Sequence, residues 1–317
     1  MNDLAKSPTP DRLTRFLIDR AGVRGVHVQL HETWQHIRER VADVAMRSPA
    51  AVEMLGQASA AAALFTGHAK VGGRLSVQLR SDSELRTLFA ECTAAGTLRG
   101  IVQLRSQEAD AGASEVVAGS RISADLKTLG DGAILAITIE NPSRHGSDPG
   151  RYQGLVALQS PSLAGAFEDY FRQSEQLPTR LLLAADQTRA AGLMLQKLPG
   201  DSGDEDGWTR VCALFDTLAA GELLDCPAET LLLRLFHEDG VQLLGDRPLG
   251  FACSCSRERV ESMLAALGED EALAAVADEH ANVRCEFCGQ QYSFTLQQVE
   301  GLLAPRAAEL AAPEQMQ

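Results

Sequence analysis

Two close pairs of cysteines near the C-terminus constrain this chain more than any other feature. Cys253 and Cys255 flank a single serine, and Cys285 and Cys288 follow after 29 intervening residues. Four thiolates in two close pairs can complete a tetrahedral shell around a soft, closed-shell cation. The spacing therefore predicts a metal site formed by these four residues, with one Zn²⁺ per chain as the cofactor.

The residues around the cysteines predict how the chain closes this site. The segment from Cys285 to Gly289 has the form of a zinc knuckle, in which backbone N–H groups face the thiolates and Gly289 relieves the turn. Between the pairs, apolar side chains recur at helical spacing and predict a helix that ends at Gly268. The stripe consists of Val260, Met263, Leu264 and Leu267, and the aromatic residues expected to cover the site are Phe287, Tyr292 and Phe294.

The segment 253–317 is small enough for a metal to decide whether it folds. A structural zinc site contributes roughly 10–16 kcal/mol of apparent binding free energy. The core of a unit of this size rarely contributes more than about 3–5 kcal/mol. We therefore expect the segment to unfold when zinc is lost.

The same four sulfurs are also sensitive to oxidants. Zinc keeps them as thiolates, which is the form that peroxide or hypochlorous acid attacks. A disulfide between cysteines one residue apart, such as Cys253 and Cys255, would be strained and reversible. The pattern is therefore compatible with a redox switch.

Hydrophobic periodicity predicts an α+β fold in three parts. Residues 1–198 are expected to form a domain around a largely antiparallel sheet, because the strand patterns are separated by few helices. Residues 199–252 begin with a turn-rich acidic run and hold 11 acidic and 3 basic residues. We expect them to be a metastable, largely helical linker that depends on docking to something larger. Residues 253–317 are expected to be a small zinc-binding domain.

Individual elements follow from the same patterns. The predicted strands cover residues 23–30, 75–79, 100–104, 133–140, 152–158, 180–185, 192–196 and 241–244. The predicted helices cover residues 33–47, 49–68, 162–174, 208–218 and 230–238. In the predicted helix 162–174, Phe167, Tyr170 and Phe171 are expected to belong to the core.

Charge and hydropathy exclude several classes of protein. The net charge is −14, and residues 199–317 hold 22 acidic but only 7 basic side chains. Nucleic-acid binding needs clustered Lys and Arg. No apolar run reaches the ~18 residues of a membrane helix, and the first residues lack the apolar core of a secretory signal. We expect a cytoplasmic protein that binds neither nucleic acid nor membranes.

The remaining cysteines are scattered and odd in number. In a reducing compartment they do not form a disulfide framework. Cys92, Cys212 and Cys226 are therefore expected to be small, buried apolar residues.

The motifs together resemble one known family, the redox-regulated 33 kDa chaperonins, or heat shock protein 33 family. The resemblance covers nearly the whole chain. It rests on Cys253-Ser-Cys-Ser-Arg-Glu-Arg259, on Cys285-Glu-Phe-Cys-Gly-Gln-Gln-Tyr292, and on residues 96–100, 151–154 and 168–180. One departure is Ser81-Asp82-Ser83, where the family often has a turn containing glycine. It alters a turn and leaves the cysteine motif intact.

The resemblance implies an ATP-independent molecular chaperone, a holdase and not an enzyme, that acts under oxidative stress. Reduced members of the family hold zinc through the four cysteines and are inactive. Oxidants convert these cysteines to disulfides between neighbours, here Cys253–Cys255 and Cys285–Cys288, and zinc is released. The zinc domain and the linker then unfold and expose apolar surface that binds unfolding client proteins, and the active form is typically a homodimer. The chain accordingly lacks a Gly-x-x-x-x-Gly-Lys loop for ATP.

Two other functions remain compatible with the residues. The chain could be a constitutive zinc-stabilised adaptor that binds one partner and has no switch, in which case its four thiols should stay protected under moderate oxidant. It could also be a thiol oxidoreductase, which requires turnover of a disulfide substrate. The absence of a βαβ pattern before Cys285 and the engagement of all four cysteines by metal disfavour the oxidoreductase.

Overall fold

The protein is represented by a computed structural model, which describes residues 11–69, 71–105, 125–142, 150–200, 203–277 and 279–310. The chain divides into two compact units between Ala252 and Cys253. Each unit has a hydrophobic core of its own. Among the helices within these ranges, none combines the length and the apolar character needed to cross a bilayer.

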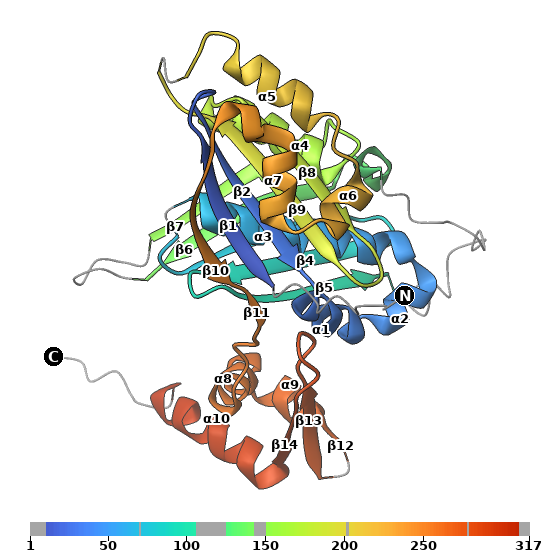
Figure 1. The fold of residues 1–317 in the computed structure, drawn as a ribbon. Helices are drawn as coiled ribbons and strands as arrows, with labels where there is room; N and C mark the ends of the chain where they lie inside the picture. The colour runs from blue at the N-terminus through green and yellow to red at the C-terminus, as the bar shows by residue number, and fades with distance from the viewer. Residues whose placement is uncertain are drawn as a thin grey trace, which may run out of the picture. The chain divides into compact units, whose positions relative to one another are not determined.

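The first unit contains a five-stranded antiparallel sheet in the order β10-β1-β2-β9-β8 (Figure 1). The central strands β2 and β9 are buried along almost their whole lengths, because helices cover both faces of the sheet. The edge strand β10 comes from the predicted linker and pairs with β1 from Arg12–Pro248 to Ile18–Val241. The strands are β1 (Arg12–Ile18), β2 (Val23–Leu30), β8 (Thr179–Ala185), β9 (Ala190–Lys197) and β10 (Val241–Pro248).

A second sheet of six strands has the order β11-β5-β4-β3-β6-β7. All neighbours are antiparallel except the short pair β11–β5. Strand β3 shows the alternation expected of a half-exposed strand, with Leu75, Val77 and Leu79 buried. The strands are β3 (Arg74–Arg80), β4 (Leu85–Thr93), β5 (Thr97–Leu104), β6 (Ile134–Asn141), β7 (Gly150–Val156) and β11 (Gly250–Phe251), and a 3₁₀ turn spans Leu126–Leu129.

Helix α3 (Pro49–His68) lies between the two sheets and contacts strands of both. The Oγ atom of Ser48 accepts a hydrogen bond from the N–H of Ala51 and caps the helix. Pro49 occupies the first helical position, where a backbone N–H would have no partner within the helix, so its missing N–H costs nothing. Most of its side chains are small and buried, so both sheets can approach the helix closely. Helices α1 (Glu32–Arg40), α2 (Ala42–Arg47) and α4 (Leu163–Tyr170) pack around it.

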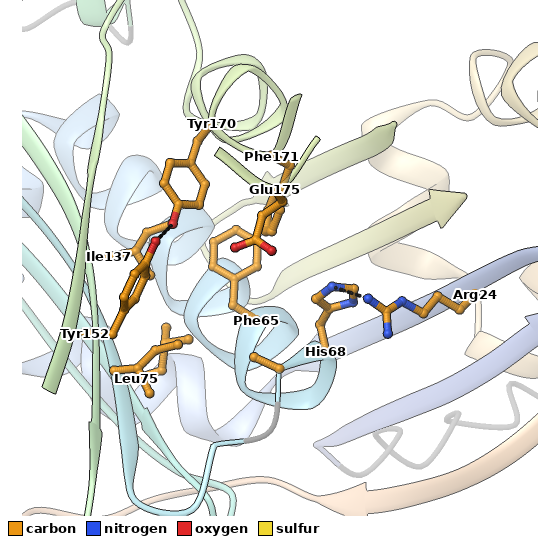
Figure 2. Close-up of a pocket in the computed structure, with 11 residues that line it drawn as sticks. Arg24, Phe65, His68, Leu75, Ile137, Tyr152, Tyr170, Phe171 and Glu175 are labelled. Carbon is orange, nitrogen blue, oxygen red and sulfur yellow. Dashed lines mark hydrogen bonds between the residues drawn. The ribbon is translucent and has the colours of Figure 1, made fainter. Parts of the chain in front are cut away.

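A pocket of about 270 Å³ lies between the two sheets near the C-terminal end of α3 (Figure 2). Its lining comes from both sheets, from α3 and from the π-helical turn Phe171–Glu175 that continues α4. The pocket therefore lies entirely within the first unit.

Three helices cover the face of the five-stranded sheet opposite α3 (Figure 1). They are α5 (Gly207–Phe215), α6 (Ala220–Asp225) and α7 (Ala228–Phe236), and a 3₁₀ turn at His237–Asp239 follows them. Their apolar side chains share one core with this sheet. Its members include Phe16, Val23 and Leu193 from the sheet and Val211, Leu231 and Phe236 from the helices. The segment 203–252 thus depends on the sheet for its core.

The second unit combines three helices with a small antiparallel sheet in the order β12-β13-β14. Ser256 caps the first helix through its Oγ atom, which accepts from the N–H of Arg259 at 3.3 Å. The guanidinium of Arg257 lies 4.2 Å from the ring centroid of Phe294. The elements are α8 (Arg257–Leu267), α9 (Glu269–Ala274), β12 (Val276–Ala277), β13 (His280–Arg284), β14 (Gln291–Thr295) and α10 (Leu296–Leu310).

The predicted α+β class with antiparallel sheets is confirmed, whereas several individual elements differ from the prediction. The predicted helix 33–47 is interrupted at the buried Val41, and the predicted helix 162–174 becomes a π-helical turn after Tyr170. The sequence patterns predict no element at β1, β4, β11, β12, β13, β14, α6, α9 or α10. Residues 12–18 form a strand because β2 and β10 pair with them on both sides, which local sequence does not reveal.

The apolar stripe predicted on α8 is correct only in part. Val260 and Leu264 are buried, but Met263 and Leu267 are 44% and 42% exposed. The helix packs on α9 and α10 through a narrow face, so the flanking positions remain in solvent. The predicted core positions Phe167, Tyr170 and Phe171 are buried.

Candidate metal centre

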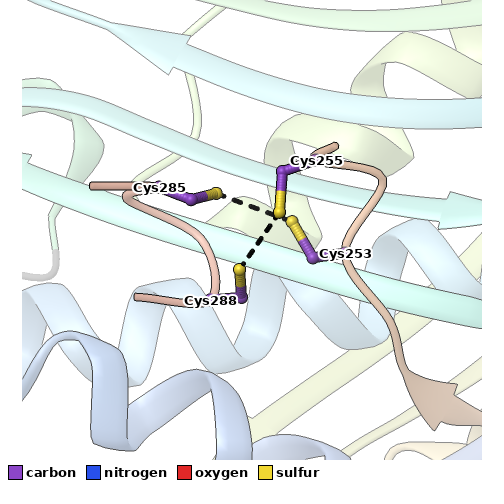
Figure 3. Close-up of side chains that lie close together, drawn as sticks. All are labelled: Cys253, Cys255, Cys285 and Cys288. Atoms are coloured by element: carbon purple, nitrogen blue, oxygen red, sulfur yellow. Dashed lines mark hydrogen bonds between the residues drawn. The ribbon is translucent and has the colours of Figure 1, made fainter. Parts of the chain in front are cut away.

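Four cysteine sulfur atoms come together in the second unit (Figure 3). The Sγ atom of Cys253 lies 3.7 Å from that of Cys285, and the Sγ atom of Cys255 lies 3.3 Å from that of Cys288. All four sulfurs lie within 4.8 Å of one another. A tetrahedron of sulfurs at about 2.3 Å from a central metal has edges of about 3.8 Å. The arrangement therefore fits one metal ion bound by four sulfurs.

Local structure on both sides positions the sulfurs. Cys253 and Cys255 lie in the extended segment before α8, where the guanidinium of Arg259 donates to the carbonyl of Ser254 at 2.7 Å. Cys285 and Cys288 lie between β13 and β14. The contact with Arg259 holds the Cys-Ser-Cys segment against the first turn of α8, and nothing in the sequence marks that arginine for this role.

The turn between the second pair of cysteines has the predicted knuckle form. The N–H of Cys285 donates to the carbonyl of Gln290 at 2.8 Å, and the N–H of Gly289 donates to the carbonyl of Cys285 at 2.7 Å. The φ angle of Gly289 is +74°, in the left-handed region that favours glycine. The chain therefore reverses within a few residues and presents both sulfurs on the same side.

Hydrogen bonds and burial shift the protonation of this cluster. Burial is the main cause that raises the pKa of Cys288 to about 12, and hydrogen bonds with the other sulfurs also raise it. A hydrogen bond with the backbone of Gln290 has the opposite effect and lowers this pKa. The hydroxyl of Tyr292 donates to the Sγ atom of Cys255 at 3.2 Å, and this bond raises the pKa of Tyr292 to about 12. A bound cation reverses the preference of the thiols, because its charge favours the thiolate form.

The donor set identifies the kind of metal that the site suits. Four sulfur donors without a carboxylate select a soft or borderline ion and are compatible with Zn²⁺. Four protein ligands leave no open coordination position, which is the pattern of a structural and not a catalytic site.

The three aromatic residues expected to cover the site have different roles. Tyr292 contacts the cluster through its hydroxyl, whereas Phe294 is 1% exposed and belongs to the core of the second unit. Phe287 is half-buried. The sequence marked Tyr292 as an aromatic cover, but its hydrogen bond to sulfur depends on the pairing of β13 with β14.

The other three cysteines lie outside the cluster. Cys92 is fully buried, and burial raises the pKa of its thiol to about 11. Cys212 is only half-buried, and burial again raises the pKa of the thiol to about 11. Cys226, also half-buried, packs beside the core shared by the sheet and helices α5–α7. The expectation of full burial thus holds for Cys92 alone.

Comparisons with known proteins agree with the cysteine pattern. The Hsp33 protein family model matches residues 11–295. A 33 kDa chaperonin of Ectopseudomonas mendocina is 41% identical over 308 residues, which cover 95% of this chain and 97% of the relative. A 33 kDa chaperonin of Nitrosococcus oceani is 37% identical over 294 residues, which cover 92% and 94% of the two chains.

A solved structure has the same fold. The crystal structure of the 33 kDa chaperonin (heat shock protein 33 homolog) of Thermotoga maritima matches with a TM-score of 0.73 at 20% identity, and covers 95% of this chain and all of the other. The family model and the curated relatives support a chaperone function, which is not a catalytic enzyme class. The chain belongs to the Hsp33 family.

Proposed function

We propose that this protein is a redox-regulated, ATP-independent holdase that binds unfolding proteins under oxidative stress. Membership of the Hsp33 family supports the chaperone part of the proposal. The observation that carries the redox part is the cluster of four sulfurs in a unit whose core, among the residues whose burial is described, contains six buried side chains. The reduced, metal-bound protein is the inactive state in this proposal.

The proposed switch is the oxidation of four thiolates to two disulfides. When bound, Zn²⁺ holds the sulfurs Cys253, Cys255, Cys285 and Cys288 as thiolates, the form that peroxide attacks. Each disulfide forms with loss of two electrons from two thiolates, while one hydrogen peroxide takes up two electrons and two protons and becomes two water molecules. Following the family resemblance, we assign the disulfides to Cys253–Cys255 and Cys285–Cys288. Oxidation removes all four ligands, so the metal is released.

Loss of the metal then unfolds the second unit. Its core consists of Val260, Leu264, Ala272, Ala281, Phe294 and Val299. A core of this size contributes a few kcal/mol at most, whereas a structural zinc site contributes about 10 kcal/mol or more. The unit therefore depends on the cross-link between its two cysteine pairs.

Unfolding of the linker helices would uncover the apolar face of the five-stranded sheet. Four polar atoms on this face have no hydrogen-bond partner within the described ranges: Thr14 Oγ1, both ring nitrogens of His27, and Gln29 Oε1. Each such buried atom costs about 1–3 kcal/mol. The helices are thus held less firmly than the apolar area alone would suggest, which supports a metastable linker at 199–252. The uncovered apolar residues would bind client proteins.

The remaining parts of the proposal concern partners and compartment. The active form is proposed to be a homodimer, as the resemblance implies. Thiols that serve as metal ligands persist where the surroundings are reducing, so the proposed compartment is the cytoplasm.

The test compares zinc content with chaperone activity before and after oxidation. Peroxide with mild heat should release one Zn²⁺ per chain, detected with a chromogenic chelator, and should enable the protein to suppress light scattering by a thermally unfolding client without ATP. Cys285→Ser should lack a complete site and have a loosened second unit when reduced, whereas Cys212→Ser, which alters a thiol outside the cluster, should behave like the parent protein.

Two results would contradict the proposal. If the fully oxidised, zinc-free protein still lets the client aggregate, the protein is not a redox-activated holdase. If thiol trapping shows that the four cysteines stay protected under moderate oxidant, the constitutive adaptor is favoured instead.

A further inference from the structure

The pocket at the end of α3 has the composition of a recognition site for a positively charged side chain. Its floor is apolar, with Leu75 and Ile137 from the six-stranded sheet. Aromatic rings form its walls (Figure 2). At about 270 Å³ it is slightly smaller than the roughly 300–1,000 Å³ of ligand pockets, which suits a single side chain better than a larger ligand.

The aromatic walls meet at steep angles. The ring centroids of Phe65 and Phe171 are 5.3 Å apart with the planes at 69°, and those of Tyr170 and Phe171 are 5.6 Å apart at 73°. Tyr152 joins this group through a hydrogen bond of 2.9 Å between its hydroxyl and that of Tyr170. A cation close to the face of an aromatic ring is attracted through the ring's quadrupole, and the attraction is strongest where water is partly excluded.

A carboxylate completes this arrangement. Glu175 ends the π-helical turn and lines the pocket, and Figure 2 shows its side chain directed toward the space bordered by Phe65 and Tyr170. It forms no hydrogen bond or contact ion pair with any residue in the described part of the chain, although burial lowers the pKa of Arg24 and the charge of Glu175 across the pocket opposes this shift. The next residue, Gln176, has a left-handed φ of +55°, which is costly for a residue with a side chain. This costly turn thus places at an aromatic pocket a carboxylate that has no contact ion pair among the described residues.

The opposite end of the pocket holds a cation that is already engaged. The guanidinium of Arg24 bonds to Nε2 of His68 at 3.0 Å and, through Nε, to Oε1 of Gln196 at 3.2 Å. Because a guanidinium can only donate, His68 must accept and is therefore neutral. In agreement, burial, with a smaller contribution from Arg24, lowers the pKa of His68 to about 4. The ring of His68 stands between Arg24 and the aromatic walls (Figure 2).

We propose that this pocket binds an organic cation of the alkylammonium or guanidinium class. The charged group of the ligand lies at Glu175 and the aromatic rings, and its apolar stem packs on Leu75 and Ile137. Resting on the proposed chaperone function, the physiological ligand is a lysine or arginine side chain of an unfolding client. The pocket is complete in the reduced protein, so it contributes to the choice of client and not to the switch.

The experiment uses the full-length, reduced, zinc-loaded protein and small probes. N-acetyl-lysine methylamide is titrated while backbone amide NMR shifts near Tyr152 are followed, and N-acetyl-norleucine methylamide serves as the isostere without charge. The lysine probe should bind at least about tenfold more tightly than the norleucine probe. Glu175→Gln should weaken the lysine probe about fivefold and leave the norleucine probe unchanged. Tyr152→Leu should weaken the lysine probe similarly.

Glu53→Gln is the matched control, because Glu53 is exposed on α3 and has no ion pair within the described residues. Three results would overturn the proposal. The lysine and norleucine probes could bind equally, Glu175→Gln could behave like Glu53→Gln, or N-acetyl-glutamate methylamide could bind more tightly than the lysine probe. This result can be distinguished from that of the chaperone test. If the protein suppresses aggregation but does not bind the lysine probe, only this inference is wrong. If it binds the lysine probe but does not suppress aggregation, the pocket is an amine site on a protein that is not a holdase.

Discussion

Helices α5–α7 and the C-terminal unit are both acidic and both belong to the last part of the chain, yet they are stabilised in different ways. The helices share a core of 16 buried residues with the five-stranded sheet. In the described part of the C-terminal unit, the core holds six buried residues, and four sulfurs form a cluster. Segment 203–252 therefore depends on docking, whereas the unit from Cys253 onward is proposed to depend on a metal cross-link between its cysteines.

Removal of the metal should separate the two regions most clearly. We expect a strong chelator to make residues 253–303 sensitive to protease while the strands of residues 12–197 stay resistant, because a structural zinc site is worth roughly 10–16 kcal/mol and the small core cannot replace it. Limited proteolysis with mass spectrometry measures this. Equal resistance of the metal-free and metal-loaded C-terminal unit would remove the basis of the comparison.

A cavity under the linker helices should weaken docking without touching the metal. Phe236 on α7 is fully buried in the shared core, so Phe236→Ala should cost about 3–5 kcal/mol. The variant should also suppress client aggregation while still reduced and zinc-loaded. Leu233→Ala on the same helix is the control, because Leu233 is 56% exposed and its loss should change the urea midpoint little. A reduced Phe236→Ala protein that is destabilised but inactive would show that undocking alone does not activate.

Acid should weaken the docked region through His27. The ring lies on the sheet face under the helices, since Gly25 and Gln29 on the same side of β2 contact Phe16 and Cys226. Burial, with a smaller contribution from Arg12, lowers the pKa of His27 to about 4 from 6.5. The unfolded state therefore binds the proton more tightly than the folded state. The free energy of unfolding should fall by roughly 3 kcal/mol as the pH decreases from 6.5 toward 4.

The measurement is the urea midpoint as a function of pH for the parent protein and for His27→Leu. The pKa of His68 is also lowered, so only the difference between the two proteins reports on His27. Replacement should flatten the acid slope, whereas His237→Gln, at an exposed position, should leave it unchanged. Parallel slopes for parent and His27→Leu would exclude His27 as the acid-sensitive group.

The smallest expected effect concerns the hydrogen bond from Tyr292 to Cys255. Tyr292→Phe removes a donor to a sulfur and keeps the ring, so zinc affinity should fall about tenfold. Competition with a chromogenic chelator measures it, and Tyr152→Phe in the first unit provides a matched control. Unchanged affinity would mean that the hydroxyl does not support the site.

The sequence was sufficient to predict features that depend on neighbouring residues alone. The two cysteine pairs and the glycine of the knuckle follow from residue type and spacing, and α3 follows from a long run of apolar and alanine-rich sequence between Pro49 and His68. Strands β1 and β4 were not predicted, because their neighbours in the sheets define them. The exposure of Met263 and Leu267 likewise depends on which face of α8 its neighbours cover.

The sequence by itself determined that four thiols can meet around one ion, because close pairs leave few other arrangements for sulfur ligands, and it determined the α+β class. Only the tertiary structure decided that the acidic segment contributes an edge strand beside β1 and that Glu175 lines an aromatic pocket. It also decided that the sheet face under the linker helices holds polar atoms without a hydrogen-bond partner among the described residues. Each of these depends on residues far apart in the chain coming together, and pairing and packing at long range leave no local signal in the sequence.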